Sequence, residues 1–253
     1  MTLVSKLEGA LNSRVGRAIA EYDMIEPNDR IMVATSGGKD SWALLFTLRR
    51  LSEKAPVSFK IAALHVDANF PGQNTEPIEK YLKHHGFEYE ILRTGIYDLM
   101  KMKLDPKDNP CSFCSRMRRG AIYGRAKKGD FSKIALGHHK EDLMETLLMN
   151  LFFIGQIRAM SPKYVTDDGR HIVIRPMIFA GERLISRYCE VMKFPVMDFC
   201  PYQGKINSQR KEMKKLIREL EKKNPKVKKS IMKAMSNVDT IHLLDKRLRQ
   251  EDL

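Results

Sequence analysis

The chain has 253 residues, 43% of them hydrophobic and 8% aromatic, proportions that are ordinary for a globular protein. No apolar run is long enough to cross a membrane, and the N-terminal stretch mixes apolar and charged residues, unlike a secretory signal. We therefore expect a cytoplasmic protein with no membrane partner. The formal net charge of +14 favours a polyanionic partner, with nucleic acid as the first candidate, although ribosome contact or simple solubility would give the same charge.

Helices and strands are predicted to alternate along most of the chain. Residues 3–22 have the spacing of an amphipathic helix, and residues 31–34 form a short apolar strand that leads through a glycine turn into a Leu- and Ala-rich helix. Further strands are predicted at 58–70, 88–94 and 132–139, and further helices at 75–87, 116–130 and 140–153. This alternation predicts an α/β protein with a doubly wound, mostly parallel sheet covered by helices on both faces.

The C-terminal third has a different pattern. Residues 164–178 read as a β-hairpin with Asp168-Gly169 at its turn. From Gly204 onward the chain is charged and helical, with one apolar face formed by Met213, Leu216, Ile217 and Leu220. We therefore divide the chain into an N-terminal helix (1–28), an α/β domain with an inserted cysteine segment (29–203) and a basic helical extension (204–253).

The glycine turn after the first strand is the most specific local signal. Adjacent glycines let the backbone turn tightly and approach a ligand, and the helix that follows offers unpaired N–H groups and the positive end of its dipole to a phosphate. A plain strand-to-helix turn with a capping Ser or Asp is the alternative. The turn differs in spacing from the Walker pattern. Its residues are Ser36, Gly37, Gly38, Lys39, Asp40 and Ser41.

Polar residues also stand at the ends of two later strands. His65 and Asp67 end the second strand, and Gly137, His138 and Asp142 follow the fourth. In an open α/β sheet a nucleotide binds at these strand ends, where a carboxylate can hold Mg²⁺ and a histidine can contact phosphate. The alternative for Asp142 is the ordinary preference of acidic residues for the first turn of a helix.

The segment SGGKDS resembles the pyrophosphate loop of the PP-loop ATP pyrophosphatases. Those enzymes cleave ATP between its α and β phosphates, hold the pyrophosphate on this loop and transfer AMP to an oxygen of the substrate. The resemblance implies a fold like that of the adenine nucleotide alpha hydrolases, with ATP and Mg²⁺ as ligands. It also implies catalytic roles for Lys39, Asp40 and Asp142.

Four cysteines are present, two of them in a C-x-x-C motif formed by Cys111 and Cys114, which we expect in a loop before a basic helix. Alone, this motif fits half of a zinc site, a redox dithiol or a chance spacing. A closed four-cysteine zinc site would require Cys189 and Cys200 together, and a site with histidine ligands remains an alternative. Because Cys189 lies among apolar residues in a helical pattern, we expect it to be a small buried side chain.

Residues 137–179, residues 194–203 and the nearby Ser-Gln-Arg at 208–210 resemble the tRNA 2-thiocytidine synthetase family (tRNA-cytidine 2-sulfurtransferases). The similarity extends over residues 29–210. In that family the two C-x-x-C cysteines and one downstream cysteine bind a [4Fe–4S] cluster, here Cys111, Cys114 and Cys200. The resemblance implies thiolation of an anticodon-loop cytidine by adenylation and sulfur transfer from the cluster. It also implies tRNA, a sulfur donor (sulfide or a cysteine desulfurase) and a second copy of the chain as partners.

Two departures from the family pattern concern the substrate. Glu141 stands where the family usually has Asp, and no second cysteine follows Cys200 closely. The alternatives are a PP-loop sulfurtransferase for another tRNA base or a small molecule, and a non-catalytic RNA-binding module with a nucleotide fold. An amide-forming ligase similar to lysidine synthetase is disfavoured by the cysteines.

Two groups of basic residues flank the proposed cluster ligands, and we expect them to engage RNA phosphates. A solvated helix face is the alternative for such a charge run. The first group is Arg116, Arg118, Arg119, Arg125, Lys127 and Lys128, and the second is Lys205, Arg210, Lys211, Lys214, Lys215 and Arg218.

Overall fold

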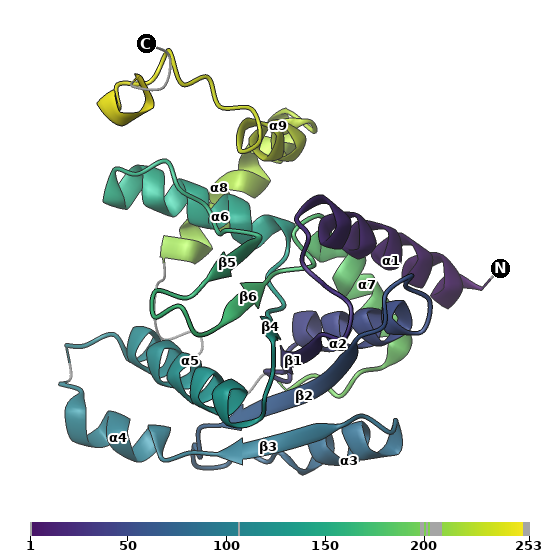
Figure 1. Ribbon diagram of the computed structural model, residues 1–253. Helices are drawn as coiled ribbons and strands as arrows, with labels where there is room; N and C mark the ends of the chain where they lie inside the picture. Colours follow the sequence, from purple (N-terminus) through teal and green to yellow (C-terminus); the bar gives the residue numbers. More distant parts are fainter. Residues whose placement is uncertain (1, 106, 198–199, 201, 203–208, 250–253) are drawn as a thin grey trace. The chain divides into compact units, whose positions relative to one another are not determined.

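The computed structural model describes residues 2–105, 107–197, 200, 202 and 209–249 (Figure 1). The chain divides into two compact units, one made of residues 1–140 and 161–207 and the other of residues 141–160 and 208–253. The boundary predicted at residues 203 and 204, the predicted RNA contact Lys205 and the serine of the Ser-Gln-Arg motif lie outside the described residues. The division into three parts therefore stays a prediction.

A six-stranded sheet forms the centre of the first unit, with the strand order β3-β2-β1-β4-β6-β5. Neighbouring strands are parallel except for β5, which is antiparallel to β6. The strands are β1 (Arg30–Ala34), β2 (Lys60–Asp67), β3 (Tyr89–Arg93), β4 (Lys133–Ala135), β5 (Lys163–Val165) and β6 (Ile172–Ile174). This arrangement confirms the predicted α/β fold with a mostly parallel sheet, and β5 and β6 form the predicted hairpin.

Helices cover both faces of this sheet (Figure 1). They are α1 (Leu3–Glu21), α2 (Lys39–Ser52), α3 (Glu76–His84), α4 (Ile96–Lys103), α5 (Pro110–Lys128) and α7 (Glu182–Met192). On one face, α1, α2 and α7 pack against one another, while α4 and α5 pack together on the other. Met32 of β1 and Leu64 of β2 belong to the buried cluster that α5 covers. Because side chains alternate along a strand, the neighbouring buried residues Ile31 and Val33 point to the opposite face.

The prediction that the C-x-x-C motif lies in a loop is wrong, because α5 begins at Pro110. The Asn109 side chain caps the helix by accepting a hydrogen bond of 3.0 Å from the Cys111 N–H. Proline at the first helical position costs no backbone hydrogen bond, since that N–H would be unpaired in any case. Cys111 and Cys114 therefore lie in the first turns of the helix, and the rigid backbone of the helix fixes their separation.

The second unit contains α6 (Lys140–Met149, which starts at the last residue of the first unit), α8 (Gln209–Lys223) and α9 (Val227–Ala234). The predicted helix over 140–153 continues past α6 as a π-helical turn, Asn150–Ile154, which ends at Gly155 with a positive φ of 72°. On α8 the predicted apolar face is present in part, since Met213 and Ile217 are buried whereas Leu220 is exposed. None of the helices in the described part of the chain combines the length and apolar character that crossing a membrane requires.

A buried ion pair joins the amino ends of the neighbouring strands β1 and β4. The Lys133 Nζ atom lies 2.6 Å from Asp29 Oδ2 and 3.2 Å from Glu26 Oε2, and its side chain is 1% exposed. Ser132 Oγ and the Glu26 N–H donate further hydrogen bonds of 2.7 Å each to the Asp29 carboxylate. Burial alone would raise the pKa of Asp29, but these hydrogen bonds and Lys133 outweigh it and hold the pKa below its ordinary value.

Replacing Lys133→Ala should lower the free energy of unfolding by about 3–5 kcal/mol, because it leaves the Asp29 carboxylate buried without a cation. Chemical denaturation at neutral pH measures this loss. Lys60→Ala, at the exposed first position of β2, is the matched control and should change stability by less than about 0.5 kcal/mol. Equal losses in the two variants would contradict a structural role for the buried pair.

Because the pKa of Asp29 is depressed, its stabilising contribution should persist at neutral pH and disappear as the pH falls below the ordinary carboxyl range.

Candidate active site

The glycine turn lies at the carboxyl end of β1, where the strand order reverses. β2 lies on one side of β1 and β4 on the other, so the loops after β1 and β4 leave the sheet at its topological switch point. The loop after β4 closely approaches the first turn of α2. A Cβ atom at Gly137 would lie 3.2 Å from the Asp40 carbonyl carbon and from the Ser41 nitrogen. The fold therefore brings together the residues 36–41 and 137–139 that the sequence singled out.

The turn itself depends on its two glycines. Gly37 has a φ of +86°, and a Cβ atom there would lie 2.9 Å from Ile78 Cδ1. Gly38 is the N-cap of α2, so no side chain caps this helix and its first N–H groups face the turn. Ser41 Oγ donates a hydrogen bond of 2.8 Å to the Gly38 carbonyl, and the Gly38 N–H donates one of 3.2 Å to Ser36 Oγ. Backbone donors at a helix N-terminus, held by short side chains, form a cradle that suits a phosphate.

Lys39 adds a cation to this cradle. Its Nζ atom lies 2.8 and 2.9 Å from the two carboxylate oxygens of Asp40 and 3.5 Å from Glu182 Oε1. Burial would lower the pKa of Lys39, but Asp40 and Glu182 outweigh it, so the pKa lies above its ordinary value and the group is charged at neutral pH. On the other side, His139 Nε2 lies 3.8 Å from Asp40 Oδ1. The Glu182 contact cannot be predicted from the sequence, because it is formed only by the packing of α7 on α2.

His65 lies beside the turn, Asp67 ends the same strand, and both are buried. His65 Nδ1 lies 2.8 Å from the carbonyl oxygen of Thr35, which only accepts, so this nitrogen carries the proton. Burial lowers the pKa of His65 and keeps the ring neutral. At 1% exposure, His65 supports the residue that precedes Ser36. Asp67 Oδ1 accepts a hydrogen bond of 2.8 Å from the Asn69 N–H and shapes the end of β2.

The other two predicted strand-end residues contact arginines. In the first unit, Arg175 Nε donates a hydrogen bond of 3.1 Å to His138 Nδ1, so the proton of the neutral ring is on Nε2. In the second unit, Arg210 Nη1 lies 3.1 Å from Asp142 Oδ1 and 3.3 Å from Glu145 Oε2. Arg210, which the sequence placed in the RNA-binding group, is thus engaged with two carboxylates of α6.

Two of the proposed cluster ligands, Cys111 and Cys200, are exposed, and Cys114 is half-buried. Cys114 and Tyr202, the residue two positions after Cys200, both pack against a hydrophobic core cluster that contains Phe70. Thiolates are the ligands that iron–sulfur clusters use. The three cysteines therefore suit such a cluster by their chemistry, and the packing of Cys114 and Tyr202 on the same hydrophobic side chains is consistent with it. Within the described ranges, however, no three Cys, His, Asp or Glu side chains lie close enough together to hold a metal ion.

The prediction that Cys189 is buried is confirmed, since its exposed fraction is 6%. Its Sγ donates a hydrogen bond of 3.1 Å to the Lys39 carbonyl. Burial raises the pKa of Cys189 to about 12, so the group is a thiol and not a reactive thiolate.

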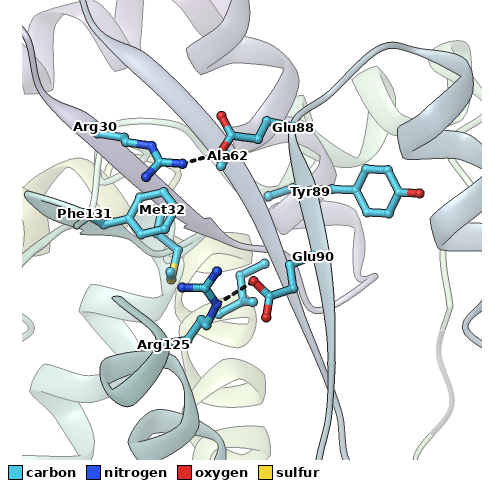
Figure 2. Close-up of a pocket in the computed structure, with 10 residues that line it drawn as sticks. Arg30, Met32, Ala62, Glu88, Tyr89, Glu90, Arg125 and Phe131 are labelled. Carbon is cyan, nitrogen blue, oxygen red and sulfur yellow. Dashed lines mark hydrogen bonds and ion pairs between the residues drawn. The ribbon is translucent and has the colours of Figure 1, made fainter. Parts of the chain in front are cut away.

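A small pocket of about 110 Å³ lies at the opposite end of the sheet, beside the first residues of β1 and β3 (Figure 2). Its two arginines are paired, Arg30 with Glu88 and Arg125 with Glu90, the latter at 2.5 Å. The Arg125 pair fastens α5 to β3. We place the candidate active site at the glycine turn, because that is where the donors and the lysine converge.

The comparisons with known proteins agree with this geometry. The family model of the PP-loop domain matches residues 7–198, so the fold and the glycine turn define a PP-loop protein. The tRNA-cytidine(32) 2-sulfurtransferase of Geotalea uraniireducens (strain Rf4) is 45% identical over 240 residues, which cover 94% of this chain and 95% of that protein. The protein of the same name from Geobacter metallireducens is 44% identical over 241 residues, covering 95% and 94%. The chain therefore belongs to the tRNA-cytidine(32) 2-sulfurtransferase family of PP-loop proteins. This confirms the predicted family and its class of enzyme, a sulfurtransferase.

A solved structure shares the fold. The U34-tRNA thiolase NcsA from Methanococcus maripaludis, solved with its [4Fe–4S] cluster, superposes with a TM-score of 0.73 at 22% identity, over 91% of this chain and 78% of that one.

Replacing Gly37→Ala should weaken ATP binding at least about tenfold, because the φ of +86° strains an alanine there and its Cβ would meet Ile78 Cδ1, so the turn or the Ile78 side chain must shift. Calorimetric titration with ATP measures this loss. Gly86→Ala is the matched control, because Gly86 also has a positive φ of 64° but has nothing within 4 Å of an added Cβ. Both variants should lose about 1–2 kcal/mol of stability, and only Gly37→Ala should lose ATP affinity. Unchanged affinity in Gly37→Ala would remove the turn from the nucleotide site.

Proposed function

We propose that this chain is a cytoplasmic, ATP-dependent enzyme that forms 2-thiocytidine at position 32 of tRNA. The observation that carries the proposal is the glycine turn with Lys39 at the switch point of the sheet, in a chain 45% identical to a tRNA-cytidine(32) 2-sulfurtransferase over 94% of its length. Its net charge of +14 suits a tRNA partner. The base must leave its stack to be reached, and in a single-stranded loop this costs little.

In the first step, O2 of the cytidine attacks the α-phosphorus of ATP. The new bond joins O2 to phosphorus, the bond between the α-phosphorus and its bridging oxygen breaks, and pyrophosphate leaves with the electron pair. The N–H groups of the turn and the first turn of α2 would stabilise the charge on the leaving group, together with Lys39 and the hydroxyls of Ser36 and Ser41. Asp40 would orient the Lys39 ammonium, which it contacts through both oxygens. Asp67 and Asp142 stay proposed as carboxylate ligands of Mg²⁺, and Gly137 and His138 as neighbours of the nucleotide.

In the second step, hydrosulfide adds to C2 of the adenylated base and AMP leaves with the oxygen that was O2. The carbon–sulfur bond replaces the carbon–oxygen bond, and the proton of hydrosulfide is released to solvent. Cys111, Cys114 and Cys200 would hold a [4Fe–4S] cluster, which would supply Lewis acidity for the sulfur transfer. We propose sulfide or a cysteine desulfurase as the sulfur source and a homodimer as the assembly.

The adenylation step predicts that tRNA stimulates pyrophosphate release from ATP. Lys39→Ala and Asp40→Ala should each reduce this release by about 100-fold or more, because the first removes the cation that faces the leaving group and the second removes the carboxylate that holds this cation in place. A coupled pyrophosphate assay, with and without unmodified tRNA, makes the measurement. If wild-type protein binds ATP and tRNA but releases no pyrophosphate, the chain is a binding module and the proposal fails.

The cluster proposal predicts about four irons and about four sulfides per chain after anaerobic purification, with broad visible absorbance. Cys200→Ala should lose the absorbance and most of the iron. The matched control is Cys189→Ala, whose side chain is a buried thiol and which should keep its full iron content. A colourless wild-type protein with one zinc would contradict the cluster and leave the nucleotide site standing.

The basic face of α5 predicts salt-dependent tRNA binding. Arg116 and Arg119 are exposed, whereas Arg125 is held by Glu90. Removing both exposed charges in Arg116→Ala/Arg119→Ala should weaken tRNA binding and lower the slope of log K against log salt by about 1.5–2. Lys80→Ala/Lys83→Ala, which removes two exposed charges from α3, should leave the slope unchanged. Equal slopes in both double variants would assign the α5 arginines to a solvated face.

A further inference from the structure

Helix α7 contacts Lys39 at its side-chain ammonium and at its backbone carbonyl. Glu182 Oε1 lies 3.5 Å from the Lys39 Nζ atom, and Cys189 Sγ donates a hydrogen bond of 3.1 Å to the Lys39 carbonyl. Glu182 and Cys189 are seven residues apart on the helix, so they lie about two turns apart on one face. One face of α7 therefore holds the lysine of the glycine turn by its charge and by its backbone.

The segment around α7 is firmly packed, so this contact is built into the fold. Ile185, Tyr188 and Cys189 are buried. Beyond the helix, the Met197 N–H donates a hydrogen bond of 2.9 Å to the Gly37 carbonyl, and the Trp42 indole donates one of 3.2 Å to the Pro195 carbonyl. Residues 182–197 thus contact the turn and α2 at several separate points.

The carboxylates around Lys39 compete with the phosphates of ATP for its ammonium group. The Lys39 ammonium is balanced by two carboxylates, of which Asp40 belongs to the turn and Glu182 reaches it from α7. The Lys39 side chain is 30% exposed, so phosphate oxygens can reach it from solvent. Phosphate of bound ATP must therefore take the ammonium from carboxylates that already hold it. An interaction that strengthens only as charge develops accelerates the reaction, whereas one already complete in the ground state does not.

We propose that Glu182 is a positioning residue for adenylation, which holds the Lys39 ammonium back from the phosphates of bound ATP until negative charge develops on the departing pyrophosphate. This inference rests on the proposed function, from which it takes the cytidine as the group that accepts AMP. Glu182 acts through Lys39 and does not contact the reacting atoms.

Glu182→Gln tests the role, because it keeps the shape of the side chain and removes its charge. Without the competing carboxylate, ATP should bind about threefold more tightly, and the single-turnover rate of tRNA-dependent pyrophosphate release should fall about tenfold. Glu182→Asp keeps the charge on a shorter side chain, so its ATP affinity should stay near that of the wild type. Its rate of pyrophosphate release should lie between those of the wild type and Glu182→Gln. Calorimetry with ATP and rapid-quench kinetics give the two values separately.

The matched control is Glu190→Gln on the same helix, whose carboxylate is 64% exposed and pairs only locally with Arg187 among the contacts described. It should change neither value. A Glu182→Gln variant with weaker or unchanged ATP binding would overturn the inference, because a merely structural role predicts a loss of affinity together with the loss of rate. A wild-type protein that binds ATP but shows no tRNA-dependent release would instead overturn the proposed function, and the ATP affinities of the variants would still test the competition at Lys39.

Discussion

The tight turn between β1 and α2 is the constraint on which the site depends. The chain must pass from a buried strand to a helix in four residues, 35–38, which places Gly37 at a φ of +86°, where a Cβ atom would lie only 2.9 Å from Ile78 Cδ1. Gly137 lets the loop after β4 lie directly on the first turn of α2. These two close approaches turn the N-terminus of α2 toward the crevice at the switch point of the sheet, where its N–H groups can meet a phosphate.

Around this turn the protein uses buried groups as supports. The neutral His65 ring holds the Thr35 carbonyl, Cys189 holds the Lys39 carbonyl, and the Met197 N–H holds the Gly37 carbonyl. Each of these contacts binds the backbone of the turn from a different element. A cradle supported in this way needs little reorganisation when a ligand arrives, which is what electrostatic stabilisation of a leaving group requires.

Much of the fold was predictable from the sequence because its signals are local. The apolar strand, the paired glycines and the Leu-rich helix follow one another directly, and the Asp168-Gly169 pair marks the hairpin of β5 and β6. The start of α5 is also encoded locally, by the N-cap Asn109 and by Pro110, although the C-x-x-C motif was predicted to lie in a loop. The approach of Gly137 to the glycine turn was likewise predictable, because both segments follow the carboxyl ends of the neighbouring parallel strands β1 and β4.

The remaining features arise from contacts between distant segments. Nothing in the sequence around Lys133 distinguishes it from a surface lysine. It contacts Asp29 in the core only because β1 pairs with β4. Glu182 reads as an ordinary first-turn carboxylate until α7 packs on α2. Sequence periodicity carries no information about such long-range partners.

Mass spectrometry of the nucleosides in a reconstituted reaction tests the central claim most directly. Anaerobically purified protein would be incubated with ATP, Mg²⁺, sulfide and tRNA that lacks thiolation, and the product would then be digested and mapped by position. The account predicts 2-thiocytidine at position 32, dependent on ATP and absent with Lys39→Ala. Sulfur on another base, or no sulfur from protein that carries its cluster and binds both ATP and tRNA, would contradict it.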